Sequence, residues 1–313
     1  MTQQPNCSQN PRRGEPENFS FPATMAGAVI CLGLVPLLEK LAVNAGSDLF
    51  SLVIAINLVT VVCLAGPAWR HRPDPLLLEW RSLLFIGAVA SGIVVLLNLW
   101  ALETTSATHR GVFQAMYPAA TALFAFFILG ERLPVKGYGV IAFMTIGIII
   151  MSSQGMRWEF VFGDLLLMLT LPLMGICDAW AKRSIGTLSP EWTAFGRFLF
   201  GSLTLVALCV LRGTLPGWPA PEAWLWIVLS GFTISFGIIL LYRGMELRGA
   251  SLAAALVGLS PVLTLLLEWL YLDGYFAAVE LLGMAMVLVG GYLLSLRDYQ
   301  QPRQEPDQEP EQA

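Results

Sequence analysis

Ten apolar segments follow one another along this chain of 313 residues. They cover residues 23–43, 50–68, 82–102, 106–129, 135–153, 161–182, 191–211, 224–242, 250–272 and 276–296. A helix of about 20 residues crosses the hydrocarbon core of a bilayer, which is roughly 30 Å thick. The segments lack the alternation of apolar and polar residues that the strands of a membrane barrel need. We therefore predict an all-α integral membrane protein with ten transmembrane helices.

The composition agrees with this prediction. Hydrophobic residues make up 56% of the chain and charged residues 13%, which is too little polar surface to cover a soluble domain of this size. The net charge of −4 comes partly from the acidic residues after Leu296, so it indicates a solvated tail and no nucleic-acid partner. With no CxxC pair and only two histidines, the chain is predicted to have no disulfide, no metal site and no cofactor.

Residues 98–133 return in a degraded copy at residues 241–276. At this offset of 143 positions Pro118 matches Pro261, and Thr121 matches Thr264. A proline inside a helix removes one backbone hydrogen bond and bends the helix. We therefore predict two bent helices that line a central cavity. Internal duplication in a membrane chain is typical of transporters.

The duplication divides the chain into two units of five helices. We assign the first repeat to residues 21–153, an outer connecting loop to residues 154–160 and the second repeat to residues 161–297. Because five is an odd number, the two repeats are inverted relative to each other in the bilayer. Residues 1–20 and 298–313 are polar, and the second of these tails is acidic, which is typical of disordered ends.

The basic residues predict the orientation. If the first segment starts inside, most lysines and arginines outside the segments face the cytoplasm, and the outer set is Lys40, Arg110, Arg157 and Arg212. The positive-inside rule then places both termini in the cytoplasm. The tryptophans lie near segment ends, as an interfacial aromatic belt requires. We predict a multi-pass protein of the bacterial inner (plasma) membrane that contacts lipids.

The order of the motifs resembles the drug/metabolite transporter superfamily, specifically its ten-helix EamA-type members. The resemblance rests on a proline-bearing fourth helix that ends in Leu-Gly-Glu-Arg at residues 129–132, a glycine-spaced fifth helix, Ser189-Pro190, and Arg197-Phe198 in the seventh helix. It implies a membrane carrier, commonly an exporter of metabolites or amino acids driven by a gradient. The chain departs from the pattern at residues 272–274, where Leu-Asp-Gly replaces the usual glycine and glutamate, and at Asn57, which occupies the place of Arg197 in the first repeat.

Charged residues within the spans are candidates for the transport site, because a charge in a bilayer is costly. Asp178 and Arg197 have matching depths near the cytoplasmic mouth, so we predict an ion pair. The pair is either a structural link between two neighbouring helices or a gate or substrate anchor, and in the second case Arg197 belongs to the substrate pathway. Glu39 and Arg110 would form the mirror pair at the outer mouth. Glu268 is a candidate for proton coupling, with the alternative that it reaches the outer interface.

Uncharged polar residues are predicted to line the substrate pathway. This set comprises Asn57, Asn98, Gln114 and Tyr117, beside Pro118 and Pro261. Such groups bind a substrate or only hold helices together, and the second outcome is commoner. Glu131 is predicted to be solvated at a loop end, and Arg243 to extend to the headgroups. Glycines in the fifth and tenth helices allow close helix packing and a contact for a homodimer.

The leading hypothesis is a secondary active transporter that exports a small polar or amphipathic, amino-acid-like metabolite by alternating access. A nucleotide-sugar or sugar-phosphate exchanger is the alternative within transport, although it would need more basic residues along the pathway. A non-transporting scaffold or a lipid scramblase is the alternative from another class. An enzyme is not expected, because the chain has no HExxH motif, no GxSxG motif and no paired histidines. It also has no P-loop that would indicate direct ATP coupling.

Overall fold

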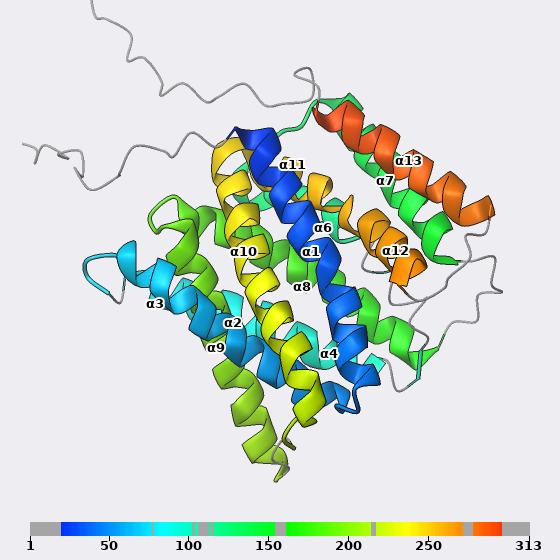
Figure 1. Ribbon diagram of the computed structural model, residues 1–313. Helices are drawn as coiled ribbons and strands as arrows, with labels where there is room; N and C mark the ends of the chain where they lie inside the picture. Colours follow the sequence, from blue (N-terminus) through cyan, green and yellow to red (C-terminus); the bar gives the residue numbers. More distant parts are fainter. Residues whose placement is uncertain are drawn as a thin grey trace, which may run out of the picture.

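The computed structural model describes residues 20–76, 78–101, 104–105, 113, 116–153, 161–213, 217–271 and 278–295, and every regular element in these ranges is helical (Figure 1). The first repeat contains α1 (Phe21–Asn44), α2 (Leu49–Arg70), α3 (Trp80–Ile86), the π-helical segment η1 (Gly87–Ile93), α4 (Val94–Ala101), α6 (Tyr117–Leu129) and α7 (Val135–Ser153). The second contains α8 (Phe162–Ile185), α9 (Pro190–Arg212), the short 3-10 helix η2 (Pro221–Ala223), α10 (Trp224–Arg248), α11 (Ala250–Val257), α12 (Ser260–Tyr271) and α13 (Ala278–Ser295).

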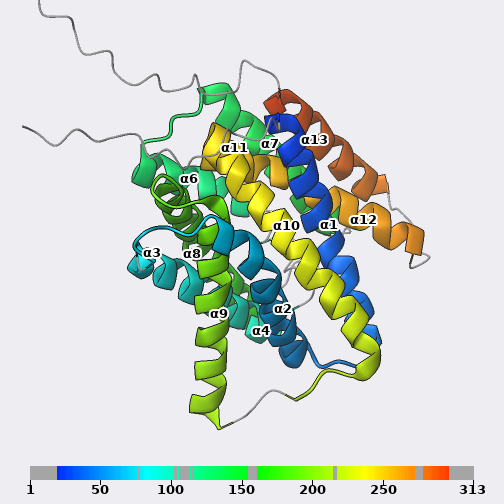
Figure 2. The same cartoon turned by 60° about the vertical axis from the view of Figure 1, so that its left-hand side comes forward.

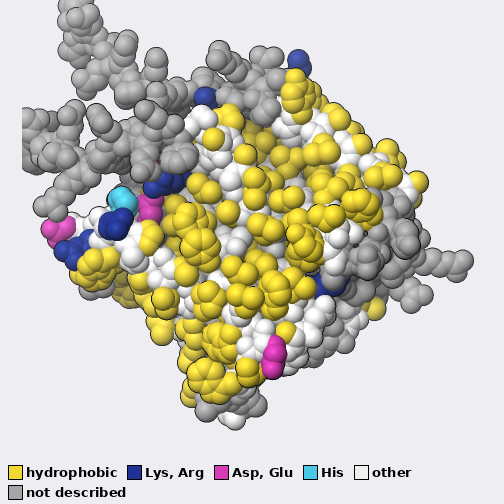
Figure 3. Space-filling model, viewed as in Figure 1, with side chains coloured by type: hydrophobic (Ala, Val, Ile, Leu, Met, Phe, Trp, Pro, Cys, Tyr) yellow, Lys and Arg dark blue, Asp and Glu magenta, His cyan; other side chains and the backbone are white. Residues whose placement is uncertain are grey.

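A described helix lies within each of the ten predicted spans. Seven helical stretches are long and apolar enough to cross a membrane; they include the continuous run α3–η1–α4 and the pair α11–α12. The remaining three, α6, α7 and α13, contain shorter apolar stretches, so the described residues contain ten apolar helical stretches in total. Large apolar side chains face outward on these helices, for example Val62 at 73% exposure and Phe127 at 70%. Figure 3 shows such a face, with charged side chains gathered mostly near its margins, as a lipid-facing surface requires.

The packing of the helices has the internal symmetry that the sequence predicts. In chain order α1, α2, α3–α4, α6 and α7 correspond to α8, α9, α10, α11–α12 and α13. The helix α1 packs on α10, and its counterpart α8 packs on α3–α4. The helix α2 packs on α10, and its counterpart α9 packs on η1. The helix α6 packs on α8, and its counterpart α12 packs on α1. The contacts of α2 with α9 and of α7 with α13 join equivalent helices. The fold is therefore two inverted five-helix repeats that pack on each other.

The start of α1 and the end of α13 lie at the same end of the molecule in both views (Figures 1 and 2). An even number of membrane crossings requires this arrangement. The long helices α1 and α10 run side by side through the molecule, whereas α9 extends farthest from the end that holds the start of α1 (Figure 2).

The two repeated prolines mark helix starts where the sequence predicts bends within continuous helices. Pro261 is the second residue of α12, which follows a turn at Gly258 and Leu259 after α11 ends. Pro118 is the second residue of α6. The expectation of a bend is therefore corrected in the ninth span, where the helix is broken. The backbone N–H groups of the first helical turn have no partner within the helix. A proline, which has no N–H group, therefore loses no hydrogen bond there, and a new helix can start at it without strain.

Glycines allow two equivalent helix crossings. A Cβ atom added to Gly87 of η1 would lie 2.6 Å from the carbonyl oxygen of Arg197 on α9. A Cβ atom added to Gly231 of α10 would lie 2.6 Å from Cγ1 of Val59 on α2. In each repeat the third span thus crosses the second span of the other repeat so closely that the glycine position has no room for a side chain. These crossings bring Arg197 against η1 and build one wall of the site described next.

Candidate functional site

A cavity of about 250 Å³ lies between the two repeats. Its wall combines residues of α1, α2, η1, α4 and α6 from the first repeat with residues of α8, α9 and α10 from the second. Five of the residues that the sequence analysis singled out line it, namely Glu39, Asn57, Asn98, Tyr117 and Arg197. The remainder of the wall is mostly apolar and includes Val53, Ile56, Val94, Leu99, Met174, Phe198 and Ile234.

The structure brings Asp178 of α8 and Arg197 of α9 together. Their side chains, 11% and 9% exposed, place Oδ1 of Asp178 at 3.6 Å from Nη1 of Arg197. The other carboxylate oxygen accepts a hydrogen bond of 3.0 Å from the hydroxyl of Thr121 on α6. The predicted ion pair therefore exists as a contact, and its role as a gate remains a prediction.

Arg197 extends this network in two more directions. Its Nη1 donates to the hydroxyl of Tyr242 on α10 at 3.0 Å, and its Nε donates to the hydroxyl of Ser91 on η1 at 3.3 Å. Both partners are buried, Tyr242 fully and Ser91 at 3% exposure. A buried charge is tolerated when it is paired and hydrogen-bonded. The result is one polar network that links α6, α8, α9, α10 and η1 and has no net charge when both ionic groups are charged.

Two asparagines line the cavity with a shared geometry. Asn57 donates its Nδ2 to the carbonyl oxygen of Val53 at 3.1 Å, and Asn98 donates its Nδ2 to that of Val94 at 2.8 Å. Each bond spans one helical turn within its own helix. A carbonyl oxygen only accepts hydrogen bonds, so the amide nitrogen must face it and the amide oxygen must point elsewhere. Oδ1 of Asn98 is buried and has no hydrogen-bond partner among the described residues.

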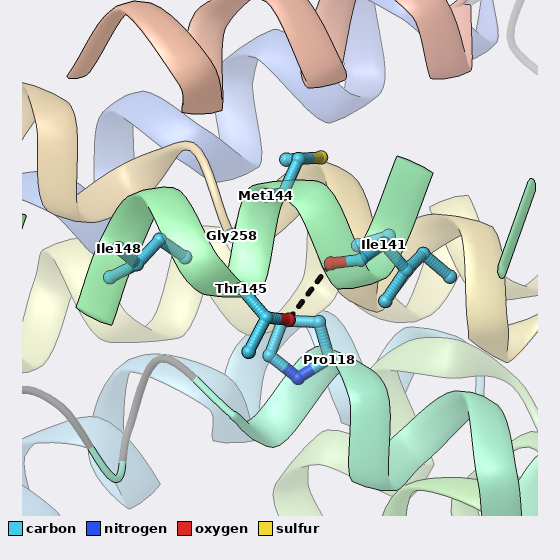
Figure 4. Close-up of a pocket in the computed structure, with 7 residues that line it drawn as sticks. Pro118, Ile141, Met144, Thr145, Ile148 and Gly258 are labelled. Atoms are coloured by element: carbon cyan, nitrogen blue, oxygen red, sulfur yellow. Dashed lines mark hydrogen bonds between the residues drawn. The ribbon is translucent and has the colours of Figure 1, made fainter. Parts of the chain in front are cut away.

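Tyr117 reaches the cavity from the start of α6, and its hydroxyl is 3.1 Å from the hydroxyl of Thr170 on α8. Its neighbour Pro118 is placed differently. The prolines Pro118 and Pro261, both predicted to lie on the substrate pathway, are not among the residues that line the large cavity. Pro118 instead lines a void of about 10 Å³ next to Thr145 and Gly258, as Figure 4 shows. This void is close to the volume of a single water-sized sphere, so it is a packing defect between α7, the start of α6 and the turn after α11, and it is too small for a substrate.

Three predicted site residues have side chains outside the described part of the chain. Arg110 and Gln114 lie outside the described residues, so the predicted pair of Glu39 with Arg110 stays a prediction. The backbone of Glu268 belongs to α12, but its side chain lies outside the described part of the chain.

Glu131 corrects the expectation of a solvated loop residue. Its carboxylate accepts hydrogen bonds from the backbone N–H groups of Ala250 and Ser251 at 2.9 and 3.1 Å, and from the Ser251 hydroxyl at 3.0 Å. It thereby caps the start of α11, a helix of the other repeat, where exposed N–H groups and the helix dipole favour a negative charge. Gly249 makes room for it, because a Cβ atom there would lie 3.0 Å from the carboxylate oxygens.

Arg243 also differs from the expectation, which directed it to the lipid headgroups. Its Nη2 lies 2.8 Å from the carboxylate of Glu191, which is 4% exposed near the start of α9. The sequence offered one signal for each correction. Glu131 follows a helix-ending glycine, and Glu191 occupies the first turn of a helix, where acidic residues are favoured. Neither signal identifies the bonding partner, which in both cases lies more than fifty residues away along the chain.

Comparisons with known proteins agree with this architecture. The model of the EamA-like transporter family matches the chain twice, at residues 22–153 and 161–296. The uncharacterized membrane protein YMR253C of Saccharomyces cerevisiae is 33% identical over 93 residues, which are 29% of this chain and 22% of that protein. The match thus spans about a fifth of the yeast protein. A solved crystal structure superposes with a TM-score of 0.70 at 16% identity over 88% of this chain and 96% of the other, which shows that the fold is shared.

Proposed function

Because this chain belongs to the EamA-like transporter family, whose members are membrane transporters of the drug/metabolite type, we propose that it is a secondary carrier that exports a small polar or amphipathic metabolite. The cavity of about 250 Å³ is the proposed substrate site. The observation that carries this proposal is the position of the cavity between the two inverted repeats. Substrate sites of inverted-repeat transporters lie at the repeat interface, and the repeats expose the site alternately to the two sides.

The size of the cavity favours a small substrate. At about 30 Å³ for each water molecule in the liquid, 250 Å³ corresponds to roughly eight water molecules. A metabolite of amino-acid size fits such a space. Among the described residues, the wall contains one arginine, Arg197, whose charge is offset by Asp178. Both observations favour a small amphipathic metabolite over the sugar-phosphate alternative.

Two groups of contacts are proposed to control access. The Thr121–Asp178–Arg197 network joins helices of both repeats beside the cavity, so its rearrangement would accompany a change between the two open states. The cap that Glu131 places on α11 joins the repeats at a second point. Glu268 is retained as the proposed proton-coupling carboxylate, and its position in α12 places it in a helix that packs on α1.

Reconstitution of the full chain into proteoliposomes tests the proposed function. Uptake or counterflow of labelled amino acids, amines and sugar phosphates is measured with and without a pH gradient. We expect saturable transport of one or more small amphipathic compounds that accelerates when the gradient is imposed. Transport of sugar phosphates alone would support the exchanger instead. Lipid redistribution without transport of any solute would support a scramblase.

We also propose that both termini face the cytoplasm of a bacterial cell, from the distribution of basic residues. A cysteine placed at Gln154, in a chain whose natural cysteines have been replaced, should react with a membrane-impermeant thiol reagent in intact cells. Labelling of that cysteine only after lysis would contradict the orientation.

A further inference from the structure

Four exposed arginines, here called the arginine cluster, lie at one end of the helix bundle. Arg70 is the last residue of α2, and Arg72 follows two positions later. Arg81 is the second residue of α3, and Arg183 belongs to the last turn of α8. Figure 3 shows basic side chains gathered at the margin of the face where Figure 1 places α3. The chain has crossed the membrane twice, in α1 and α2, when it reaches Arg70, so this margin belongs to the side at which α1 starts.

Three members of the arginine cluster lie over the ring of a tryptophan. The distances from the guanidinium carbon to the ring centre are 5.0 Å for Arg72 over Trp69, 5.6 Å for Arg81 over Trp80 and 5.8 Å for Arg183 over Trp180. Stacking of this kind uses the face of the guanidinium group and leaves the N–H groups on its edge for other partners. Because tryptophan rings favour the depth of the lipid headgroups, the stacks hold positive charge at that depth.

Two of the stacks belong to neighbouring helix ends. Nε1 of Trp180 on α8 donates a hydrogen bond of 3.4 Å to the hydroxyl of Ser82 on α3, and the Trp180 ring centre lies 5.4 Å from that of Phe85. Ser82 directly follows Arg81, and Trp180 precedes Arg183 by about one helical turn. The contact between α8 and α3 therefore brings the backbone positions of Arg81 and Arg183 close to each other.

The positive charge of the arginine cluster exceeds the negative charge beside it. The connection between α2 and α3 contains two acidic residues, Asp74 and Glu79. The carboxylate of Glu79 accepts a hydrogen bond of 2.7 Å from the hydroxyl of Ser82. In the described part of the chain, the ion pairs do not include any of the four arginines. A partner with a negative group would therefore supply the charge that this surface lacks.

Apolar side chains continue the same face of α3 into the membrane. Leu84 and Phe85 follow Arg81 by three and four residues, so they lie on its side of the helix, and each is 39% exposed. A partner that matches both parts of this surface carries a negative head and a hydrocarbon chain, as an anionic phospholipid does. The acidic tail at residues 298–313 matches the charge, but Tyr299 is its one large apolar side chain, so it matches the hydrocarbon surface less well.

We propose that the ends of α3 and α8 form a binding site for an anionic phospholipid of the adjacent leaflet, with the phosphate on Arg81 and Arg183 and an acyl chain along Leu84 and Phe85. The planar guanidinium groups suit a phosphate, because each can donate two parallel hydrogen bonds to it. The residues that line the large cavity do not include these four. The site is therefore separate from the proposed substrate site, and either can fail without the other.

Three compounds test the chemistry of the partner. The full chain in a neutral detergent is titrated with phosphatidylglycerol, with phosphatidylcholine of the same acyl chains, or with glycerol 3-phosphate, and the midpoint of thermal unfolding is measured. A ligand that binds the folded state raises the midpoint by mass action. Phosphatidylcholine has the phosphate and the chains but no net charge, and glycerol 3-phosphate has the phosphate without the chains. We expect a saturable rise with phosphatidylglycerol, a smaller one with phosphatidylcholine and none with glycerol 3-phosphate.

Paired substitutions locate the effect. Arg81→Gln with Arg183→Gln should weaken the apparent Kd for phosphatidylglycerol at least about tenfold, because each basic residue near an anionic lipid contributes to its attraction. The control is Arg132→Gln with Lys136→Gln, which removes the same charge from exposed residues on the same side of the membrane and should weaken the Kd less than about twofold. Arg81→Lys with Arg183→Lys keeps the charge without the planar fork and should bind with intermediate affinity. This third variant also tests the site if the glutamine variant does not fold.

Equal weakening in the glutamine variant and in its control would overturn the inference, since it would show attraction by the whole basic side of the protein. Equal stabilisation by the two lipids would contradict the need for a negative head. A comparable effect of glycerol 3-phosphate would assign the arginines to a soluble phosphate compound instead. If phosphatidylglycerol binds only after residues 298–313 are deleted, the acidic tail is the occupant and the lipid is not.

Discussion

The two repeats use one threonine position in different ways. In the first repeat Thr121 of α6 donates to the carboxylate of Asp178 on α8 at 3.0 Å. In the second repeat Thr264 of α12, at the equivalent position, donates to the backbone carbonyl oxygen of Gly33 on α1 at 2.8 Å. Equivalent hydroxyl groups thus join equivalent pairs of helices, in one repeat through a charged side chain and in the other through the backbone.

The comparison extends to the second helix of each repeat. Arg197 of α9 forms an ion pair with Asp178. Asn57 occupies the corresponding place in α2, and within the described part of the chain its hydrogen bond goes to its own helix. The buried ion pair of α8 and α9 lies beside a cavity to whose wall the first repeat contributes Asn57 of α2 and Glu39 of α1.

The largest expected effect comes from removing one member of the ion pair. Asp178→Asn or Arg197→Met leaves the other group charged, buried and unpaired, which typically costs about 3–5 kcal/mol in the free energy of unfolding. The double variant should cost less than either single variant. Thermal unfolding and counterflow, measured together, separate the roles: we expect the double variant to regain stability while its transport stays lost.

The control for this experiment is Asn57→Leu in the first repeat, which removes one hydrogen bond within a helix and should cost about 1 kcal/mol. Additive losses in the Asp178 and Arg197 variants would show that the two residues do not interact. Recovery of both stability and transport in the double variant would reduce the pair to a structural link.

The threonine pair sharpens the comparison directly. Thr121→Val removes a hydrogen bond to a charged group and should destabilise the protein by about 1.5–3 kcal/mol. Thr264→Val removes one to a backbone carbonyl and should cost about 1 kcal/mol. Chemical unfolding of the two variants in one detergent measures the difference. Equal losses would mean that the carboxylate of Asp178 does not strengthen its contact with Thr121.

Glu131 tests a contact that joins the repeats at a helix end. Glu131→Ala leaves the first N–H groups of α11 without their acceptor and should lower stability by about 1–2 kcal/mol, the range for loss of a helix cap. Its neighbour Arg132 is exposed, so Arg132→Ala should change stability by less than about 0.5 kcal/mol. Thermal unfolding of both variants provides the measurement, and equal effects would argue against the cap.

The smallest effect concerns the caps of α2 and α9, which are equivalent helices. Asp48 accepts hydrogen bonds from the N–H groups of Phe50 and Ser51 at 3.0 Å, and Ser189 accepts one from Trp192 at 3.1 Å. Partial burial alone would raise the pKa of Asp48, but the hydrogen bonds from Ser51 and Phe50 outweigh it and hold the pKa below its usual range. The stabilisation is therefore present above the ordinary pKa of an aspartate and is lost as the pH falls through the lowered value.

We expect Asp48→Ala to cost about 0.5–1 kcal/mol at neutral pH, at the low end for a cap because the carboxylate is exposed to solvent. The difference from the unmodified chain should shrink as the pH is lowered past the pKa of Asp48. Ser189→Ala should cost about as much at neutral pH but show no such dependence. A constant difference for Asp48→Ala across that range would show that its charge does not contribute.

Much of the architecture could be predicted from the sequence. Hydropathy over about 20 residues is a local quantity, so it located the ten spans without knowledge of their neighbours. The offset of 143 positions between Pro118 and Pro261 predicted two equivalent helices, and the structure starts a helix at each proline. Matching depths brought Asp178 and Arg197 together, because depth in a bilayer depends on distance along the chain from a span end.

Tertiary structure decided the partners and the directions of the side chains. Glu131 and Arg243 bond to Ser251 and Glu191, and no local pattern identifies a partner that far along the chain. The sequence placed Asn98 near a pathway, but only the structure shows that its Nδ2 bonds to Val94 while its Oδ1 is buried without a hydrogen-bond partner among the described residues. The physical reason is that hydropathy and helix length are set by neighbouring residues, whereas hydrogen bonds and cavities depend on which helices approach one another.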